Sequence, residues 1–541
     1  MSEEEKISSQ PAEDVTTAPA EEASAGGEAA AVASPHKGFF GKLDNYFGIT
    51  KSGSNYKTEI IAGLTTFMAM VYILIVNPGM FSAIPGLSFE GMFIATALGA
   101  IVGTMLMAFL AKMPLAQASG MGVNAFVVFT LVLYGAGLTY ANAMVFTLLD
   151  GIIFIILTVT GLRKHIFTAI PDEVRKAINV GLGLFIAFIG LQNAGVIVND
   201  ASTLVNLTSF NVLNLSKNLS FFVTYNAGTV GGMLPAIVAL LGVTSIAIMA
   251  KKNVKGSILW GILGSTVLFY ILAGLGCLAG GEKALFLADG TFIGDTNGEA
   301  CKAIFSSITI DNPFTAFGNW GTESAGKVFY EGFDFSNYLA GNNVGSLIVL
   351  LVTSALSLCM LDMFDTLGTL YGACSKGGLL DKDGNPLNMN RCMLADAIAT
   401  TTGAIFGTST VTTFVESSAG VAAGGKTGFT ALITGLCFIF AMLLSPIAKL
   451  IPSAATATAL IWVGVLMMSS VNQIEWTDPA VALPAFLTIA VMAFGYEISY
   501  GIGIGIISSV IVRICTGKVK TISVVTWIIA AFFLATFLLT H

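Results

Sequence analysis

The stretch GTSTVTTFVESSAGVAAGG (407–425) combines hydroxyl side chains, a glutamate and glycines in a chain that is otherwise rich in long apolar segments. It lies between two apolar segments, 390–408 and 428–448, but hydroxyl side chains, Glu416 and glycines make it a poor continuous helix. Thr and Val at 408–415 favour a short extended strand, and the small residues after Glu416 favour a half-helix. A broken segment of this kind at membrane depth is typical of a transporter's substrate site.

The first half of the chain contains a matching segment, AQASGMGVNAF (116–126), with the same small and polar residues. The two segments are each third in order within their half. In the sixth position, LPAIVALLGV (234–243) resembles LPAFLTIAVM (483–492). Seven spans per half, an odd number, place the halves in opposite orientations. The sequence therefore predicts two inverted repeats with paired broken helices around a midplane site.

Composition supports a membrane protein throughout. The 541 residues are 55% hydrophobic and only 11% charged, with a mean hydropathy of +0.82, whereas soluble domains are about 25% charged. Spanning a membrane takes about 20 mostly apolar residues. We predict an all-α polytopic protein with fourteen transmembrane segments near 58–80, 91–111, 114–134, 141–162, 174–194, 231–250, 256–279, 344–371, 390–408, 410–425, 428–448, 454–471, 480–497 and 499–514.

The N-terminal tail and the predicted spans divide the chain into five regions. Residues 1–36 hold eight acids and one base, which is the whole net charge of −7, and this tail is expected to be disordered. The sequence leaves open whether the apolar stretch 521–540 crosses the membrane or lies along it. The predicted regions are a disordered tail with a pre-membrane segment (1–55), a first repeat (56–280), an extracellular loop (281–343), a second repeat (344–515) and a C-terminal apolar segment (516–541).

Basic residues in the short loops set the orientation. They fall on one side of the membrane if the N-terminus is cytoplasmic, with Lys449 as the exception. We therefore expect a multi-pass protein of the plasma or inner membrane. The residues on the cytoplasmic side are Lys37, Lys42, Lys51, Lys57, Arg163, Lys164, Lys251, Lys252, Lys255, Lys376, Lys382, Lys518 and Lys520.

Ionisable side chains inside apolar segments are costly, so each one is a functional candidate. Asp362 and Asp365 are i, i+3 neighbours on one helix face, and two close carboxylates resist joint ionisation, which suits a proton-carrying role. Glu416 can accept a hydrogen bond from a ligand N–H group. Asp396 and Glu497 are interpreted as structural, and the role of Asp150 is left open.

Other motifs carry less weight. Residues 420–427 fit the nucleotide-binding expression G-x-x-x-x-G-K-[ST], but they lie between membrane segments and lack the strand and helix of an α/β domain. We therefore interpret Lys426 as an anchor at the membrane surface.

Cys277 and Cys301 could pair across the outer loop. Three scattered histidines provide no metal site, and no cofactor or nucleic-acid site is expected.

Four segments together resemble the AzgA-like purine permeases, a branch of the nucleobase–ascorbate transporter superfamily. They are GLTTFMAMVYILIVNPGMF (63–81), GMGVNAF (120–126), LDMFDTLGTLYG (361–372) and TSTVTTFVESSAGVAAGGKTG (408–428), and the resemblance covers nearly all of 55–515. The combination of the last two motifs is highly specific.

The resemblance implies a core of spans one to four and eight to eleven, a gate of the remaining spans, and proton-driven uptake of hypoxanthine, guanine or adenine. It matches Asp365 and Glu416 to the two acids that hold the base, although Thr369 stands where related proteins have an Asp. The implied substrate-binding set is Asn124, Phe126, Asp365, Phe414, Glu416 and Ser417, and the implied proton-coupling set is Asp362, Asp365 and Glu416.

Two alternatives accompany this interpretation. The same fold could carry pyrimidines or another neutral solute, whereas anionic substrates are disfavoured because no Lys or Arg lies deep inside the core segments. A membrane enzyme would need a nucleophile–base pair or a metal set, for which there is no candidate. The expected partners are a purine base, protons and the lipid bilayer, and whether the protein forms a homodimer is left open.

Overall fold

The computed structural model describes residues 38–133, 137–161, 170–200, 202–208, 224–226, 229–231, 233–278, 285–286, 292–293, 312–382 and 384–540. Within them, ten helices are long and apolar enough to cross a membrane. The remaining predicted spans are shorter or more polar helices, among them the two broken segments. The predicted all-α membrane fold is confirmed, and the fold is two inverted repeats of seven segments.

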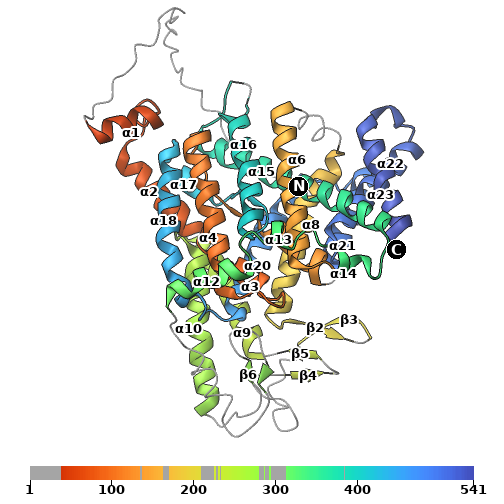
Figure 1. Ribbon diagram of the computed structural model, residues 1–541, viewed down its shortest axis with the longest axis horizontal. Helices are drawn as coiled ribbons and strands as arrows, with labels where there is room; N and C mark the ends of the chain where they lie inside the picture. The colour runs from red at the N-terminus through yellow and green to blue at the C-terminus, as the bar shows by residue number, and fades with distance from the viewer. Residues whose placement is uncertain are drawn as a thin grey trace, which may run out of the picture.

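Helices from the two halves interleave in the core. Orange α4 lies beside blue α18 (Figure 1), and α18 also packs on α2. The core elements are α2 (Tyr56–Met70), α3 (Ile73–Phe81), α4 (Phe89–Leu106), β1 (Gln117–Ser119), α5 (Met121–Ala125), α6 (Tyr140–Thr160), α15 (Val344–Gly377), α16 (Met389–Phe406), β8 (Val411–Thr413), α17 (Ser417–Ala422) and α18 (Gly428–Ala441).

The gate is a second group of helices in which α8 packs against both α20 and α21. Blue α21 and α22 lie on the far side of the molecule from α2 and α18 (Figure 1). The gate helices are α8 (Asp172–Asn193), α9 (Met233–Lys251), α10 (Ser257–Leu278), α20 (Ser453–Met467), α21 (Pro479–Phe494) and α22 (Ile498–Cys515). Small residues let these helices approach closely, since the backbones of Gly183 and Gly464 face each other across the α8–α20 contact.

Two helices flank the repeats. The helix α1 (Phe39–Phe47) lies in the predicted pre-membrane segment, where no helix was expected, and its Phe47 packs edge-on against Phe429 of α18. The C-terminal apolar segment forms α23 (Val524–Thr540), which packs on α22 and α15. Its Phe537 ring contacts Tyr500 with the centroids 5.0 Å apart.

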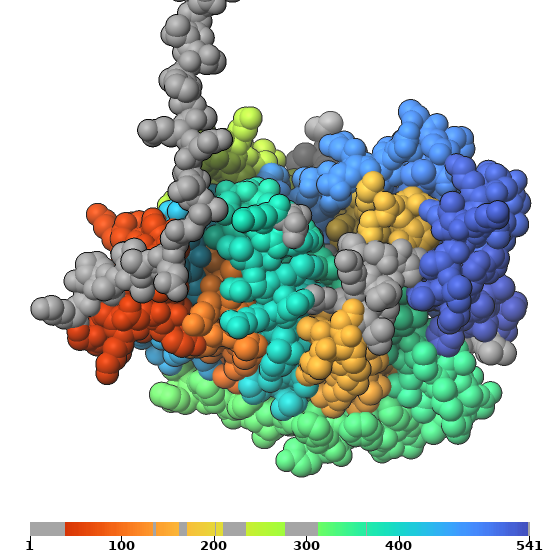
Figure 2. Space-filling view, turned by 90° about the horizontal axis from the view of Figure 1, so that it is seen from above, coloured from red at the N-terminus to blue at the C-terminus, as the bar shows by residue number. Residues whose placement is uncertain are grey.

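The two long connections carry structure that the sequence analysis did not predict. Three two-stranded hairpins lie there, and the helices between residues 313 and 339 (green) run along one edge of the molecule in Figure 2. The hairpins are β2 (Ile197–Asp200) with β3 (Leu204–Leu207), β4 (Thr224–Asn226) with β5 (Thr229–Gly231), and β6 (Leu285–Phe286) with β7 (Phe292–Ile293). The helices are α12 (Pro313–Glu323), α13 (Lys327–Tyr330) and α14 (Ser336–Leu339).

Candidate functional site

The two broken segments meet at the centre of the core. Strands β1 and β8 pair antiparallel, with Gln117 opposite Thr413 and Ser119 opposite Val411. Each strand leads into a short helix, α5 or α17. Non-helical backbone is tolerated at membrane depth because the strands satisfy each other's hydrogen bonds inside the protein. The predicted pair of broken segments is therefore confirmed, and the two lie side by side.

Asp396 of α16 holds the strand pair in place. One carboxylate oxygen accepts hydrogen bonds from Gln117 Nε2 at 2.7 Å and Thr413 Oγ1 at 3.1 Å. The other oxygen accepts from Thr366 Oγ1 at 2.7 Å, so Asp396 connects both strands to α15. Its buried bonds agree with a structural role. Arg391, its neighbour in sequence, is not among these hydrogen-bond donors.

A cavity of about 880 Å³ separates the core from the gate beside this strand pair. Asp365 and Glu416, two of the predicted site residues, both line it. A neighbouring cavity of about 710 Å³ also reaches Glu416 and continues toward Lys255. The larger cavity is lined by Asn179, Asp365, Gly368, Thr369, Tyr371, Gly372, Ser375, Lys376, Leu380, Val415, Glu416, Ser418, Val463, Leu466, Met467, Ser469, Ser470 and Gln473.

Glu416 is positioned by a tyrosine that the sequence analysis missed. Tyr72 is fully buried between α2 and α3, and its hydroxyl donates to Glu416 Oε1 at 2.6 Å. Glu416 itself immediately precedes α17, where the expected half-helix begins. The first span is interrupted between α2 and α3, at Val71 and Tyr72, and Tyr72 in this interruption contacts Glu416. In the sequence, no polar residue in 63–81 indicates the interruption as clearly as Glu416 does in the tenth span.

The two aspartates of α15 have different surroundings despite their i, i+3 spacing. Asp365 lines the cavity and accepts from Thr412 Oγ1 of β8 at 3.3 Å. Asp362 is fully buried behind it and accepts from Thr400 Oγ1 of α16 at 3.1 Å. Only Asp365 can therefore contact a ligand in the cavity directly.

Four other predicted site residues lie behind the cavity wall. Phe126 and Asn124 are fully buried, and Asn124 Oδ1 accepts from Ser119 Oγ at 2.9 Å. Phe414 is 7% exposed. Ser417 Oγ accepts from the backbone N–H of Ala116 at 3.0 Å, which links α17 to the chain before β1. The structure brings these residues close to the strand pair but not into the lining of the cavity.

Five carboxylates, three fully buried and two half-buried, occupy this region without a cationic partner among the described residues. Asp150 of α6 is fully buried and accepts from Thr410 Oγ1 at 3.4 Å, which places it beside β8. Asp362 interacts electrostatically with Asp150, Asp396 and Asp365, and Asp365 interacts with Glu416. No ion pair in the described part of the chain includes any of the five. Because isolated charges at membrane depth are costly, this arrangement suits groups that take up protons.

In the segment that fits the nucleotide-binding expression (420–427), hydrogen-bond donors are bound by a carboxylate of the protein itself. Glu59 of α2 is fully buried, and its carboxylate accepts from the backbone N–H of Lys426 at 3.0 Å and from the hydroxyls of Thr427 and Thr430 at 2.9 and 2.6 Å. A phosphate would need these same donors. The Glu59 carboxylate therefore binds the donors that a nucleotide phosphate would need, in agreement with the rejection of a nucleotide site.

We expect the substitution Glu59→Ala to lower the thermal stability of the detergent-solubilised protein. It would remove the acceptor of the buried hydroxyls of Thr427 and Thr430 and of the part-buried N–H of Lys426, at about 1–3 kcal/mol for each buried group left unpaired. The melting temperature is the measurement, and Glu331→Ala on the exposed α13 pair with Lys327 is the matched control. A Glu59→Ala protein as stable as the control, or a wild-type protein stabilised by ATP, would contradict this assignment.

The chain is similar to known proteins over most of its length. Residues 57–504 match the model of a family described as a permease family. The chain is 36% identical to the guanine/hypoxanthine permease PbuO of Bacillus subtilis, over 91% of this chain and all of that protein. It is 33% identical to the adenine permease AdeP of Escherichia coli, over 91% of this chain and 95% of that protein.

Solved structures show a similar fold at low sequence identity. The transmembrane domain of the cyanobacterial bicarbonate transporter BicA gives a TM-score of 0.56 at 16% identity, covering 82% of this chain and 97% of that chain. The murine anion transporter Slc26a9, in its inward-facing state, gives a TM-score of 0.55 at 14% identity, covering 90% of this chain and 74% of that chain.

Proposed function

Since this chain belongs to the permease family of nucleobase transporters, we propose that it takes up purine bases by coupling their entry to protons. Membership in the family makes the chain a membrane transporter and not an enzyme. The proposed substrates are hypoxanthine, guanine and adenine.

The observation that carries the proposal is the cavity between core and gate, with Asp365 and Glu416 on its core wall. A purine base is flat, neutral and rich in N–H donors, and two carboxylates accept such donors. Hydroxyl groups of Thr369, Ser418 and Ser469 add adaptable hydrogen-bonding partners. A site of this kind discriminates between bases because a polar group left unpaired in the bound state reduces affinity.

Proton coupling is supported by the surroundings of the acids. Asp365 and Glu416 contact the cavity, whereas Asp362, Asp396 and Asp150 continue the line of carboxylates into the core. Taking up a proton removes the cost of a charge at this depth. We propose that Asp365 and Glu416 hold the base, and that Asp362 shares a proton with Asp365 and Glu416 during the cycle.

We place the protein in the cell membrane with the N-terminus in the cytoplasm. The support is the distribution of basic residues, which includes Lys255 and Lys376 in the linings of the two cavities. In this orientation both cavities face the cytoplasm. The structure would then be inward-facing, ready to release or bind the base on the inner side.

The test is uptake of radiolabelled hypoxanthine by cells that lack their own purine permeases. We expect saturable uptake, inhibited by unlabelled guanine or adenine but not by an excess of uracil. The control is the same cells with an empty vector. Uptake of uracil or cytosine without purine uptake would replace the proposal by its alternative, a pyrimidine permease on the same fold.

A further inference from the structure

The two walls of the cavity offer different hydrogen-bonding groups. The core wall presents the acceptors Asp365 and Glu416, and the gate wall presents two primary amides, Asn179 from α8 and Gln473 from the turn after α20. An amide carries both a donor and an acceptor, whereas an ionised carboxylate only accepts. The core wall therefore suits the N–H edge of a base, and the gate wall suits an edge that needs donors.

Asn179 is the amide that lies opposite the substrate-holding acids. A methyl group placed on Gly368 would lie 3.9 Å from Asn179 Nδ2. Gly368 is one turn beyond Asp365 on α15 and lines the same cavity. The Asn179 side chain is half-buried, and no hydrogen-bond partner for it is found among the described residues. Its amide is thus free to bind a ligand held between the two walls.

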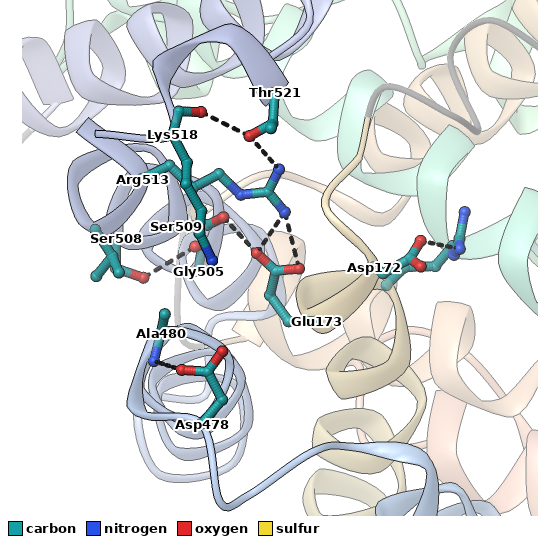
Figure 3. Close-up of polar contacts among 12 residues, drawn as sticks. Asp172, Glu173, Asp478, Ala480, Gly505, Ser508, Ser509, Arg513, Lys518 and Thr521 are labelled. Carbon is teal, nitrogen blue, oxygen red and sulfur yellow. Dashed lines mark hydrogen bonds and ion pairs between the residues drawn. The ribbon is translucent and has the colours of Figure 1, made fainter. Parts of the chain in front are cut away.

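The beginning of α8 is fixed within the gate. The Glu173 carboxylate accepts from Arg513 Nη2 at 2.9 and 3.1 Å and from Ser509 Oγ at 2.6 Å, both on α22 (Figure 3). Glu173 is six residues before Asn179 on the same helix. The amide therefore sits on a rigid element, which is what a selective contact requires.

Purines carry an acceptor that pyrimidines lack, the imidazole nitrogen N7. Amide side chains bind the adenine N7 and N6 groups in pairs in nucleic-acid complexes, the N–H donating to N7. In hypoxanthine and guanine, N7 and O6 both accept, and Lys376 on the cavity wall is a second donor within the same lining. A base whose N–H groups face Asp365 and Glu416 presents its remaining acceptors to the gate.

We propose that Asn179 recognises N7 of the bound base, and so selects purines over pyrimidines. This inference rests on the proposed function, because it assumes that the cavity binds a nucleobase. It adds a residue of the gate to the two acids of the core, Asp365 and Glu416, that are proposed to hold the base. Discrimination would then depend on both walls closing on the same base.

The test combines Asn179→Leu with a substrate that lacks N7. Inhibition constants are measured against labelled hypoxanthine uptake for hypoxanthine and for 7-deazahypoxanthine, in which a C–H group replaces N7. In the wild type we expect the analogue to bind about tenfold more weakly, as for a lost hydrogen bond that leaves a buried group unpaired. In Asn179→Leu, hypoxanthine should weaken by a similar factor while the analogue changes little.

Two further variants keep the test decisive. Asn179→Asp retains the shape of the side chain but removes the N–H donor, and should abolish the preference for N7 even if the leucine variant folds poorly. Asn472→Leu removes an exposed amide outside the cavity and should keep the wild-type preference. Equal weakening of both ligands in Asn179→Leu and Asn179→Asp would overturn the inference while leaving purine transport intact. A wild type that takes up no purine would instead overturn the proposed function, and this inference with it.

Discussion

Replacing Glu416 with alanine is expected to reduce base uptake by about 100-fold or more, to the background of cells without the transporter. A hydrogen bond to a charged acceptor contributes about 1.5–3 kcal/mol, and its loss leaves a buried N–H group of the base unpaired. The substitution also removes the acceptor of the Tyr72 hydroxyl, so the pocket loses two matched contacts at once. Initial uptake rates at equal surface expression are the measurement.

The control for this experiment is Glu475→Ala, which removes an exposed glutamate from the loop before α21. Its uptake should equal that of the wild type. Glu416→Gln keeps an acceptor but loses the charge, and should retain a small part of the activity. A Glu416→Ala protein that reaches the membrane in normal amounts and takes up hypoxanthine at the wild-type rate would disprove the assignment.

Uptake is also expected to rise as the external pH falls and to collapse when a protonophore dissipates the proton gradient. The reason is the cluster of Asp150, Asp362, Asp365, Asp396 and Glu416. Three of these carboxylates are fully buried, two line the cavity, and none has a cationic partner among the described residues. A neutral base that enters with a proton is driven by both the pH difference and the membrane potential. The measurement is the accumulation ratio of labelled hypoxanthine at several external pH values.

The coupling experiment has its own controls. Lys426→Ala should leave the protonophore sensitivity unchanged and should not make uptake depend on ATP, because Glu59 occupies the backbone donors of that turn. Accumulation that persists with the protonophore and follows an imposed sodium gradient would show that sodium, and not the proton, is the coupling ion.

The sequence was most informative where it departed from a simple membrane helix. The polar interruptions at 116–126 and 407–425 predicted two broken segments, and the pairing of β1 with β8 confirms them. Polar groups at membrane depth need hydrogen-bond partners inside the protein. A run of small and hydroxyl residues between apolar segments therefore predicts a segment that packs against protein and not against lipid. The apolar spans were predicted for the same reason, since length and hydropathy suffice to identify them.

Which side of a helix faces the cavity was harder to predict. Asp362 and Asp365 differ by only about 60° around α15, given 3.6 residues per turn, yet one lies inside the core and the other lines the cavity. Tyr72 and Asn179 were missed because nothing local distinguishes them from ordinary residues of a membrane helix. Their roles depend on neighbours more than 180 residues away in the chain.

Lys376 adds a positive charge to both cavities. The core segments were expected to contain no deep basic residue, and anionic substrates were disfavoured on that ground. Lys376 is an exposed residue in the last turn of α15, where it lines both cavities, so it does not contradict that expectation. The carboxylates Asp365 and Glu416 still dominate the charge of the larger cavity, so a neutral base remains the favoured ligand.

The pairing of β1 with β8 has a consequence for how the protein is made. Gln117 and Thr413 are separated by almost 300 residues, so the first strand leaves the ribosome long before its partner exists. Contacts of such high sequence separation form late in folding. Until β8 arrives, the backbone of β1 needs water, a chaperone or a temporary partner, since unpaired strand groups are not tolerated in lipid. Biogenesis of the site is therefore a property of the complete chain, and halves expressed separately should become stable only when they are produced together.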